Sequence, residues 1–264
     1  MNLNFKEKTI LITGGSKGIG FELANQFLKL DANVCICSRD KKNLQNAQKK
    51  LLNNNNRNRL LILQHDISKI KKQSLLIKNI KKKFKTNVDI LINNSGGPAP
   101  KKIEKLDLYD WTKSIETNLL SAITLSNQVL KEMKKNRWGR IINMTSTTAK
   151  EPAKNMALSN VTRAALTSFS KTLSMEIADY GITVNTILTG GCLTDRLISL
   201  VKNNSSDNKN FKHNLKQIIN QTPMKRIAEP NEFVKLIIFL ASNHSSYING
   251  TAIAIDGGTS KGIF

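Results

Sequence analysis

Residues Thr9–Gly20 read TILITGGSKGIG, and this stretch decides the fold. Its apolar run Thr9–Thr13 predicts a short buried strand, and a segment of helical period begins directly after the glycines, at Phe21. A glycine-rich turn between a strand and a helix suits the pyrophosphate of a dinucleotide, because the free N–H groups at the start of the helix attract phosphate. The stretch therefore predicts a dinucleotide site, with candidate contacts at Gly14, Ser16, Lys17, Gly18, Ile19 and Gly20.

Further short apolar runs alternate with segments of helical period along the rest of the chain. Buried parallel strands read as continuous apolar runs, so the pattern predicts an α/β fold: a single doubly wound Rossmann domain with about seven parallel strands and helices on both faces. We expect further strands at 34–38, 60–65, 88–93, 139–145, 183–188 and 251–256, and helices at 19–30, 41–52, 70–84, 108–135, 155–180 and 230–242.

The 264 residues are predicted to form one domain, 1–264, because no repeat and no Pro/Gly-rich linker divides the chain. One irregular segment, Thr194–Thr222, interrupts the alternation of strands and helices and has a polar centre, NNSSDNKN, at 203–210. Long excursions of this kind are often functional lids. We expect the segment to be a flexible substrate flap.

The composition excludes several classes of protein. Hydrophobic residues make up 39% of the chain, which is enough for a core and too much for a disordered protein. No run of about 18 apolar residues and no apolar N-terminal signal segment occurs, so we expect no membrane span. The three cysteines cannot form a disulfide framework, and neither they nor the three histidines match a metal site. These features together predict a cytoplasmic protein.

The chain is strongly basic, with 41 Lys and Arg against 19 Asp and Glu and a net charge of +22. Such a charge raises nucleic acid as a partner, because Lys and Arg neutralise phosphates. The excess is spread over both halves, however, and the densest lysine cluster falls on the polar side of the helix expected at 70–84. The abundance of Lys, Asn and Ile suggests a codon bias toward A and T. We favour a solvated basic surface over a nucleic-acid site.

The end of the second expected strand bears on the choice of dinucleotide. A carboxylate there would hydrogen-bond both ribose hydroxyls of NAD, but this chain has Ser38 followed by Arg39. Arg39, together with Lys17 of the glycine turn, suits a 2′-phosphate. The sequence therefore favours NADP(H) over NAD(H), with stacking of Arg39 on adenine as the alternative that NAD would also allow.

Several motifs after the glycine turn occur in a recognisable order. They are Asp66, Asn93-Asn94-Ser95-Gly96 after the fourth strand, Trp138–Ser146 along the fifth, Val184-Asn185, Gly190 with Thr194, and Asp256-Gly257-Gly258. In this order and spacing the chain resembles the short-chain dehydrogenase/reductase family over nearly its whole length. It is also similar to the 3-oxoacyl-carrier-protein reductases within that family.

The resemblance implies a role for each matching residue. Asp66 and Ile67 would line the adenine pocket, and Asn93, Ser95 and Gly96 would form the turn that supports the sheet and borders the nicotinamide ribose. Gly190 and Thr194 would hold the nicotinamide carboxamide, although Thr189 stands where the family usually has proline. The implied catalytic residues are Ser146, which would bind the substrate oxygen, and Asn118, which would help to hold a proton-relay water.

The resemblance also implies what the protein does and with what it assembles. It implies hydride transfer between the nicotinamide and a carbonyl/alcohol substrate, either a small molecule or a group linked to an acyl carrier. It further implies a homotetramer or homodimer built through the helices expected at 108–135 and 155–180.

The catalytic helix departs from the family. Members normally carry Tyr-x-x-x-Lys about 13 residues after the serine, whereas this chain has Ser159 and Arg163 at those positions. A serine hydroxyl is a much weaker acid than a phenol, and Arg163 stays protonated at neutral pH. The guanidinium would still suit ribose hydroxyls and a developing alkoxide. The chain resembles a subset of the family that pairs such a Ser-x-x-x-Arg segment with a Gly-Gly-Pro turn, here Gly96–Pro98.

Three interpretations of this departure remain open. Ser159 and Arg163 form an altered proton relay with Asn118, Ser146 and water. Alternatively, the substrate or another side chain supplies the proton, the nearby candidates being Lys150, Lys154 and Tyr109. In the third, the protein binds a dinucleotide in a binding or regulatory role without hydride transfer. A recurring pattern is better explained by a changed function than by decay, so we favour an enzyme.

Overall fold

The computed structural model describes residues 3–203 and 208–263. Its strands form one sheet in the order β3-β2-β1-β4-β5-β6-β7, and every neighbouring pair is parallel. The ends of the strands differ from the predicted ends by two residues at most, and the predicted fold is confirmed. The strands are β1 (Thr9–Thr13), β2 (Asn33–Ser38), β3 (Leu60–Gln64), β4 (Ile90–Asn93), β5 (Gly139–Ser146), β6 (Ile182–Thr189) and β7 (Ala252–Ile255).

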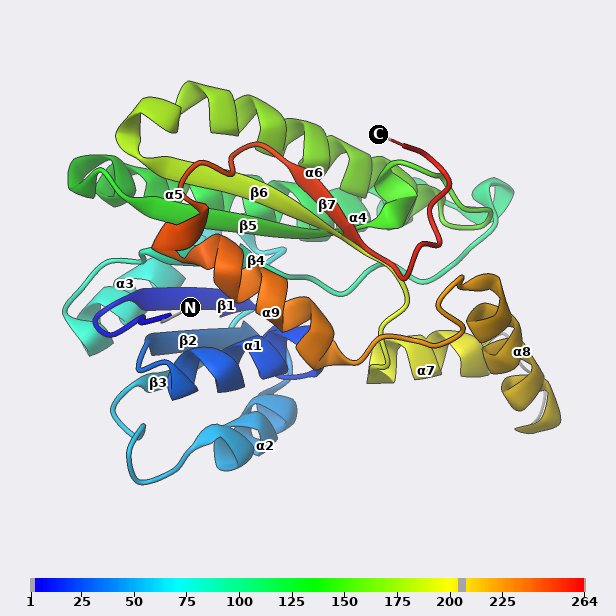
Figure 1. Ribbon diagram of the computed structural model, residues 1–264, viewed down its shortest axis with the longest axis horizontal. Coiled ribbons are helices and arrows are strands. Elements are labelled where there is room, and N and C mark those ends of the chain that lie inside the picture. Colours follow the sequence, from blue (N-terminus) through cyan, green and yellow to red (C-terminus); the bar gives the residue numbers. More distant parts are fainter. Residues whose placement is uncertain (1–2, 204–207, 264) are drawn as a thin grey trace.

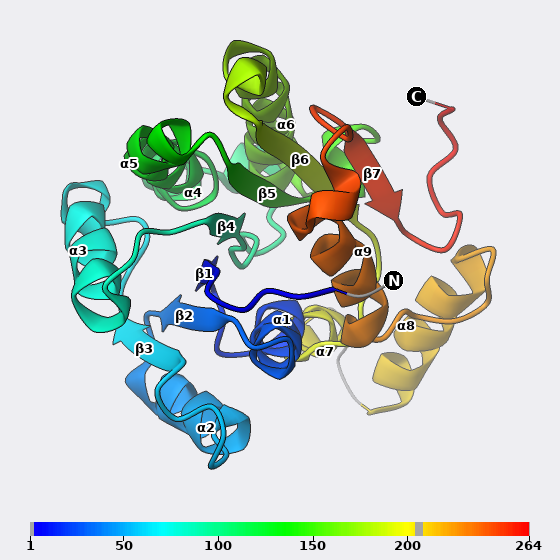
Figure 2. The same ribbon diagram turned by 60° about the vertical axis from the view of Figure 1, so that its left-hand side comes forward.

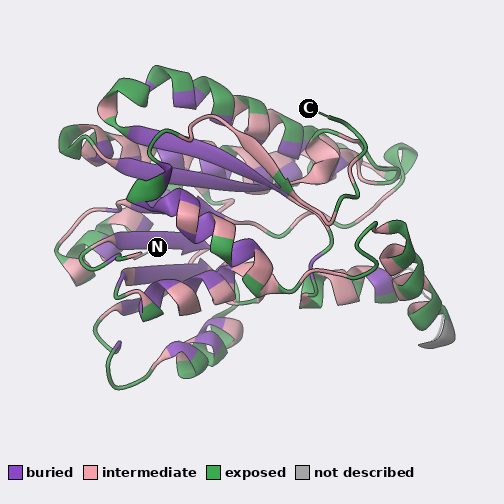
Figure 3. Cartoon of the chain, in the orientation of Figure 1, coloured by how far each residue is buried: buried purple, intermediate pink, exposed green. Residues whose placement is uncertain are grey.

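Helices cover both faces of this sheet (Figures 1 and 2). One face carries α1 (Gly18–Lys29), α2 (Lys41–Leu51) and α9 (Pro230–Ala241). The other carries α3 (Gln73–Phe84), α5 (Ser121–Asn136) and α6 (Ala157–Glu176), with α4 (Leu108–Ile115) next to α6. The sheet is therefore the middle of three layers. Figure 3 shows that the central strands are buried, while the edge strand β7 is mostly half-buried and the helices keep an exposed side.

The sheet separates two hydrophobic cores. Side chains along a strand point alternately to its two faces, so Ile10 and Ile12 join one core and Leu11 joins the other. Cys35 and Cys37 lie in the same core as Leu11 and are fully buried, as predicted for core residues. Burial raises the pKa of the Cys37 thiol to about 12, which keeps this thiol protonated and unreactive at neutral pH.

The order of the strands determines where a ligand can bind. The chain runs outward from β1 to β3 on one side and then crosses back to β4 on the other, so the direction of winding reverses between β1 and β4. The loops that follow these two strands diverge to opposite faces and leave a crevice at the carboxyl ends of the strands. The glycine turn follows β1, and the Asn93–Gly96 turn follows β4.

Two predicted elements differ in the structure. The helix expected at 108–135 is interrupted between α4 and α5 by a π-helical turn, Glu116–Leu120. The flap expected to be irregular contains two helices, α7 (Asp195–Asn203) and α8 (Asn208–Gln221), and its centre, 204–207, lies outside the described residues. α7 and α8 are amphipathic, but their many polar residues hid the helical period. Within the described ranges, no helix is both long and apolar enough to span a membrane.

Candidate functional site

The glycine turn takes the conformation that its sequence requires. Gly14 and Gly18 have φ values of +59° and +54°, a backbone conformation that residues with side chains rarely adopt. Any Cβ on Gly14 would also lie 2.7 Å from the carbonyl oxygen of Asn94. The Asn94 side chain donates to the carbonyl oxygens of Thr13 and Gly14, at 3.1 and 3.2 Å. Asn94 thus fixes the glycine turn to the end of β4.

The start of α1 is free to bind an anion. α1 begins after Lys17, and among the described residues the N-cap side chain makes no capping hydrogen bond. Unsatisfied N–H groups at a helix N-terminus, together with the helix dipole, favour phosphate. Thr194 lies against the turn, because a Cβ on Gly18 would stand 3.1 Å from its methyl group. Lys17 also pairs with Asp195 at 3.2 Å, so α7 folds over the glycine turn.

The ends of β2 and β3 present the residues expected at the adenosine end. Ser38 is half-buried and Arg39 is exposed, and the carbonyl oxygen of Arg39 accepts from the side chain of Gln64. The neighbouring carboxylate, Asp40, accepts the N–H of Asn43 and caps α2. Asp66 accepts the N–H and the hydroxyl of Ser68, and the carbonyl of the adjoining Ile67 accepts from Gln73.

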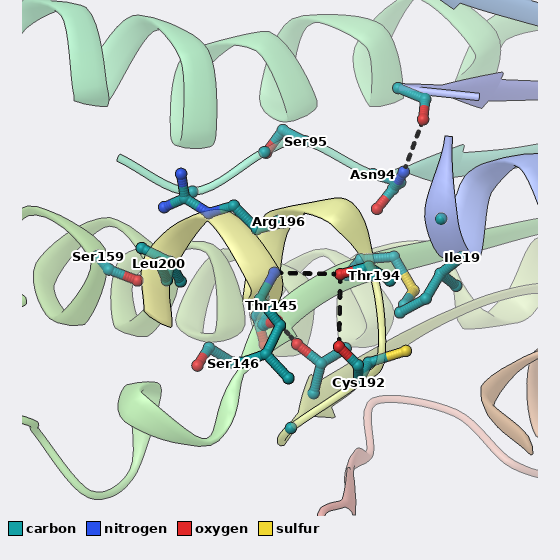
Figure 4. Close-up of a pocket in the computed structure, with 18 of the residues that line it drawn as sticks. Ile19, Asn94, Ser95, Thr145, Ser146, Ser159, Cys192, Thr194, Arg196 and Leu200 are labelled. Carbon is teal, nitrogen blue, oxygen red and sulfur yellow. Dashed lines mark hydrogen bonds between the residues drawn. The ribbon is translucent and has the colours of Figure 1, made fainter. Parts of the chain in front are cut away.

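A cavity of about 380 Å³ lies at the carboxyl ends of the strands. It brings together the glycine turn, the turn after β4, the end of β5, the start of α6 and the segment from Thr189 into α7 (Figure 4). The predicted site residues that line it are Gly14, Lys17, Gly18, Ile19, Ser95, Gly96, Ser146, Ser159, Arg163, Gly190 and Thr194. Those that lie outside its wall are Ser16, Gly20, Ser38, Arg39, Asp66, Ile67, Asn93 and Asn118.

Ser146 is positioned by the end of β5. Its hydroxyl accepts the N–H of Thr148 at 3.2 Å, which leaves its proton free to donate toward the cavity. Beside it in the sheet stands Thr189, whose hydroxyl donates to the carbonyl of Thr145 at 2.7 Å. The threonine that replaces the expected proline therefore adds a bond between β5 and β6.

Ser159 and Arg163 lie one turn apart on α6, and both are buried, with 4% and 5% of their surface exposed. The guanidinium of Arg163 donates to the carbonyls of Met144, at 2.8 Å, and Ser95, at 3.0 Å. Burial first, and then the charge of Arg196, lower the pKa of Arg163 to about 10, so it remains a cation at neutral pH. Arg163 therefore bridges the ends of β4 and β5 and places a buried positive charge beside the cavity.

Asn118 connects to Arg163 through the turn after β4. It lies in the π-helical turn and is buried, and its side-chain oxygen accepts the hydroxyl of Ser95 at 3.0 Å. Its amide nitrogen donates to the carbonyl of Ser114 at 3.2 Å. Ser95 thus contacts Arg163 through its backbone carbonyl and Asn118 through its side-chain hydroxyl. π-Turns inside helices frequently occur at functional sites.

Asn93 lies inside the fold rather than at the cavity. Its amide donates to Asn143 of β5 at 2.8 Å and to Ser126 of α5 at 3.3 Å. Asn143 in turn donates to Ser170 of α6 at 2.7 Å. Asn93 therefore joins the sheet to its covering helices, while Asn94 reaches the glycine turn.

Asn94 and Arg196 are among the site residues that the sequence analysis missed. Asn94 belongs to the Asn93–Gly96 motif after β4. Its position directly after a strand that pairs with β1 could have indicated a contact with the glycine turn. Arg196, on α7, lines the cavity and donates to the carbonyl of Pro98 at 2.6 Å, but no motif surrounds it. The alternative proton donors Lys150, Lys154 and Tyr109 are exposed and do not line the cavity. Across the described ranges, no group of His, Cys, Asp and Glu could hold a metal ion.

A family model described as short chain dehydrogenase matches residues 8–205. The chain is 31% identical to the NADPH-dependent reductase BacG of Bacillus subtilis over 97% of this chain and 99% of that protein. It is 33% identical to the 3-oxoacyl-[acyl-carrier-protein] reductase FabG of Chlamydia trachomatis, over 95% and 96% of the two chains.

Solved structures share the whole fold. The L-sorbose reductase of Gluconobacter frateurii, complexed with NADPH and L-sorbose, superposes with a TM-score of 0.92 at 30% identity, over 100% of both chains. The similarity therefore includes both halves of the sheet and the segment that carries α7 and α8.

Proposed function

The chain belongs to the short chain dehydrogenase family, and we propose that it is an oxidoreductase that transfers a hydride between NADP(H) and a carbonyl/alcohol pair. The observation that carries this proposal is the cavity in which the glycine turn meets Ser146, Ser159 and Arg163. The relatives support it, since BacG is named an NADPH-dependent reductase and the L-sorbose reductase was solved with NADPH.

The residues present fit a dinucleotide. Gly14 and Gly18 keep side chains away from the turn itself, and the N-cap residue Lys17 makes no capping bond, so the N–H groups at the start of α1 suit phosphates. Arg163 offers N–H donors toward the ribose at the nicotinamide end. Its two bonds to carbonyls hold the guanidinium in place for this contact.

The end of β2 supports NADP(H) over NAD(H). The carboxylate nearest this end, Asp40, is engaged as the cap of α2. The exposed guanidinium of Arg39 is therefore the charged group best placed for a 2′-phosphate, a contact that NAD cannot make. Within the described part of the chain, no hydrogen bond or ion pair holds the Arg39 side chain elsewhere.

The chain's own residues supply an altered proton relay. When bound, NADPH supplies the hydride. The hydroxyl of Ser146 donates to the substrate oxygen and polarises the carbonyl, while the cation of Arg163 stabilises the negative charge that develops there. Ser159 occupies the usual position of the tyrosine, and its hydroxyl serves to hold water rather than to act as the acid. The alkoxide that hydride transfer forms takes its proton from this water, and solvent restores the proton. Ser95 holds the surrounding groups in place, because its carbonyl accepts from Arg163 and its hydroxyl donates to Asn118.

The substrate is a carbonyl compound, either small or linked to an acyl carrier, and we propose a homotetramer or homodimer as the assembly. Large apolar side chains are exposed on the helices that the family resemblance assigns to subunit contacts. They are Leu108 and Tyr109 of α4, Leu120 of the π-turn, and Val161 and Met175 of α6. Light scattering with size-exclusion chromatography measures the mass, and a monomer at micromolar concentration would contradict the assembly.

Turnover with a carbonyl panel tests the proposed function. NADPH oxidation is followed with ketones, 2-oxo acids and 3-oxoacyl thioesters, for the protein and for Ser146→Ala. We expect the unaltered protein to catalyse NADPH oxidation. In Ser146→Ala we expect kcat to fall about 10²-fold, the magnitude typical for one polarising donor, and NADPH affinity to stay unchanged. NADPH binding without oxidation of any carbonyl would instead support a binding or regulatory protein.

A further inference from the structure

The cavity wall carries more positive charge than its own residues neutralise. Its cations are Lys17, Arg163 and Arg196, and among the described residues of the wall the single carboxylate is Asp195. Asp195 pairs with Lys17 at 3.2 Å. The two guanidinium groups therefore face the cavity without a carboxylate partner there.

The hydrogen bonds of the two arginines leave most of their donors unused. Each guanidinium has five N–H donors. Arg163 uses two nitrogens on the carbonyls of Met144 and Ser95, and Arg196 uses one on the carbonyl of Pro98. Neutral carbonyls compensate a cation only weakly, and the charge of Arg196 contributes to the lowered pKa of Arg163. Two like charges held near each other in a cavity favour an anion between or beside them.

The position of Arg196 assigns this anion to the substrate side of the cavity. In Figure 4 its guanidinium extends from α7 toward the turn that carries Ser95, on the side where Leu200 and Ser159 lie. The pyrophosphate is expected at the glycine turn. That turn contacts α7 through the ion pair of Lys17 with Asp195, the residue before Arg196. Gly97 lies beneath the guanidinium, since a Cβ there would stand 3.6 Å from one of its nitrogens.

We propose that the substrate carries a carboxylate near its reacting carbon, and that Arg196 binds this carboxylate and so selects for it. The inference rests on the proposed function, whose substrate class it narrows to oxo acids and related anions. An arginine suits this task because its planar fork matches a carboxylate with two parallel hydrogen bonds.

Paired acids and esters test the proposal by binding rather than turnover. Benzoylformate and 2-oxohexanoate are each compared with their methyl esters in titrations of the protein with and without NADPH, read by thermal shift and by NADPH fluorescence. The variants are Arg196→Gln, Arg196→Lys, and Arg57→Gln, which makes the same change of charge on an exposed loop. We expect at least one acid to bind about tenfold or more tightly than its ester, a preference that Arg196→Gln abolishes, Arg196→Lys reduces and Arg57→Gln leaves intact.

Each other result has a definite meaning. Equal binding of acids and esters, or an acid preference that survives Arg196→Gln, overturns the proposal. A loss of NADPH affinity in Arg196→Gln as large as the loss of acid affinity also overturns it, because Arg196 would then bind the phosphates of the cofactor. Tight, Arg196-dependent binding of an acid that is never reduced leaves this inference standing and contradicts the proposed function instead.

Discussion

The starts of α1 and α6 face the same cavity, but they contribute to it in different ways. α1 contributes backbone: glycines at positive φ, a helix start without a cap, and Asn94 holding the turn in place. α6 contributes side chains, and there Ser159 and Arg163 replace the tyrosine and lysine expected of the family. A site built from backbone depends on shape, whereas a site built from side chains depends on acidity and charge. The cofactor half can therefore stay intact while the chemistry of the other half changes.

Disrupting the backbone half is expected to have the largest effect. Gly14→Ala places a methyl group 2.7 Å from the carbonyl of Asn94 at a residue with φ of +59°. We expect unfolding free energy to fall by about 3 kcal/mol and NADPH affinity to fall with it. Gly96→Ala is the matched control for stability, because a Cβ there meets nothing within 4 Å. Chemical denaturation measures the unfolding free energy of the two variants, and fluorescence titration measures their NADPH affinity. Equal stability of the two variants would contradict the role given to Gly14.

The second-largest effect is expected when the positive charge of Arg163 is removed from the side-chain half of the site. Arg163→Leu leaves the carbonyls of Met144 and Ser95 without their donor and removes the buried cation. We expect turnover to fall about 100-fold, or about 2.7 kcal/mol. Arg163→Lys keeps the charge with fewer donors and should retain part of the activity. Turnover at saturating NADPH is the measurement, and full activity of the leucine variant would exclude Arg163 from the relay.

The adenosine end offers a smaller and more selective effect. Arg39→Ala should weaken NADPH binding about tenfold, or about 1.4 kcal/mol, and leave NADH within about twofold. Fluorescence titration with the two cofactors gives both numbers. Lys41→Ala, a change at another exposed cation near the start of α2, serves as the control. Equal losses for NADPH and NADH would show that Arg39 stacks on adenine rather than binding a phosphate.

The smallest effect is expected in the dependence of kcat on pH, which tests the altered relay. A serine hydroxyl does not titrate, and the guanidinium of Arg163, with its pKa lowered to about 10, stays charged below about pH 9. We expect kcat to be flat between about pH 6 and 9 and to fall above about 10, where the cation loses its proton. The double variant Ser159→Tyr/Arg163→Lys should turn over simple ketones severalfold faster and acquire an ionisation within that range. An ionisation near neutral pH in the unaltered protein would mean that another side chain is the acid.

The contrast between backbone and side-chain features also explains which parts of the structure the sequence predicts. Buried strands such as β1 were located to the residue, because a fully apolar run between a polar start and a glycine turn has few alternatives. The glycine turn was recognised for the same reason, since its backbone requires particular residue types. The π-turn at Glu116–Leu120 was missed because one inserted residue does not disturb the apolar period of a long helix.

Side chains that come from distant segments were harder to find. Arg196 meets Pro98 and the neighbourhood of Arg163 only after α7 folds over the cavity, and no local pattern marks it. The polar composition of 194–222 suggests an irregular flap, whereas the structure has two amphipathic helices there, α7 and α8. Whether this segment closes over a substrate stays a prediction.

One experiment tests most directly the claim that an intact dinucleotide site serves an altered relay. The protein is titrated with NADPH and with NADH by fluorescence, and ketones and 2-oxo acids are then added to the same cuvette. The account predicts tight binding of NADPH, weaker binding of NADH, and oxidation of the bound NADPH by at least one carbonyl compound. Tight binding with no oxidation across the whole panel would contradict it, and Ser159 and Arg163 would then mark the loss of hydride transfer.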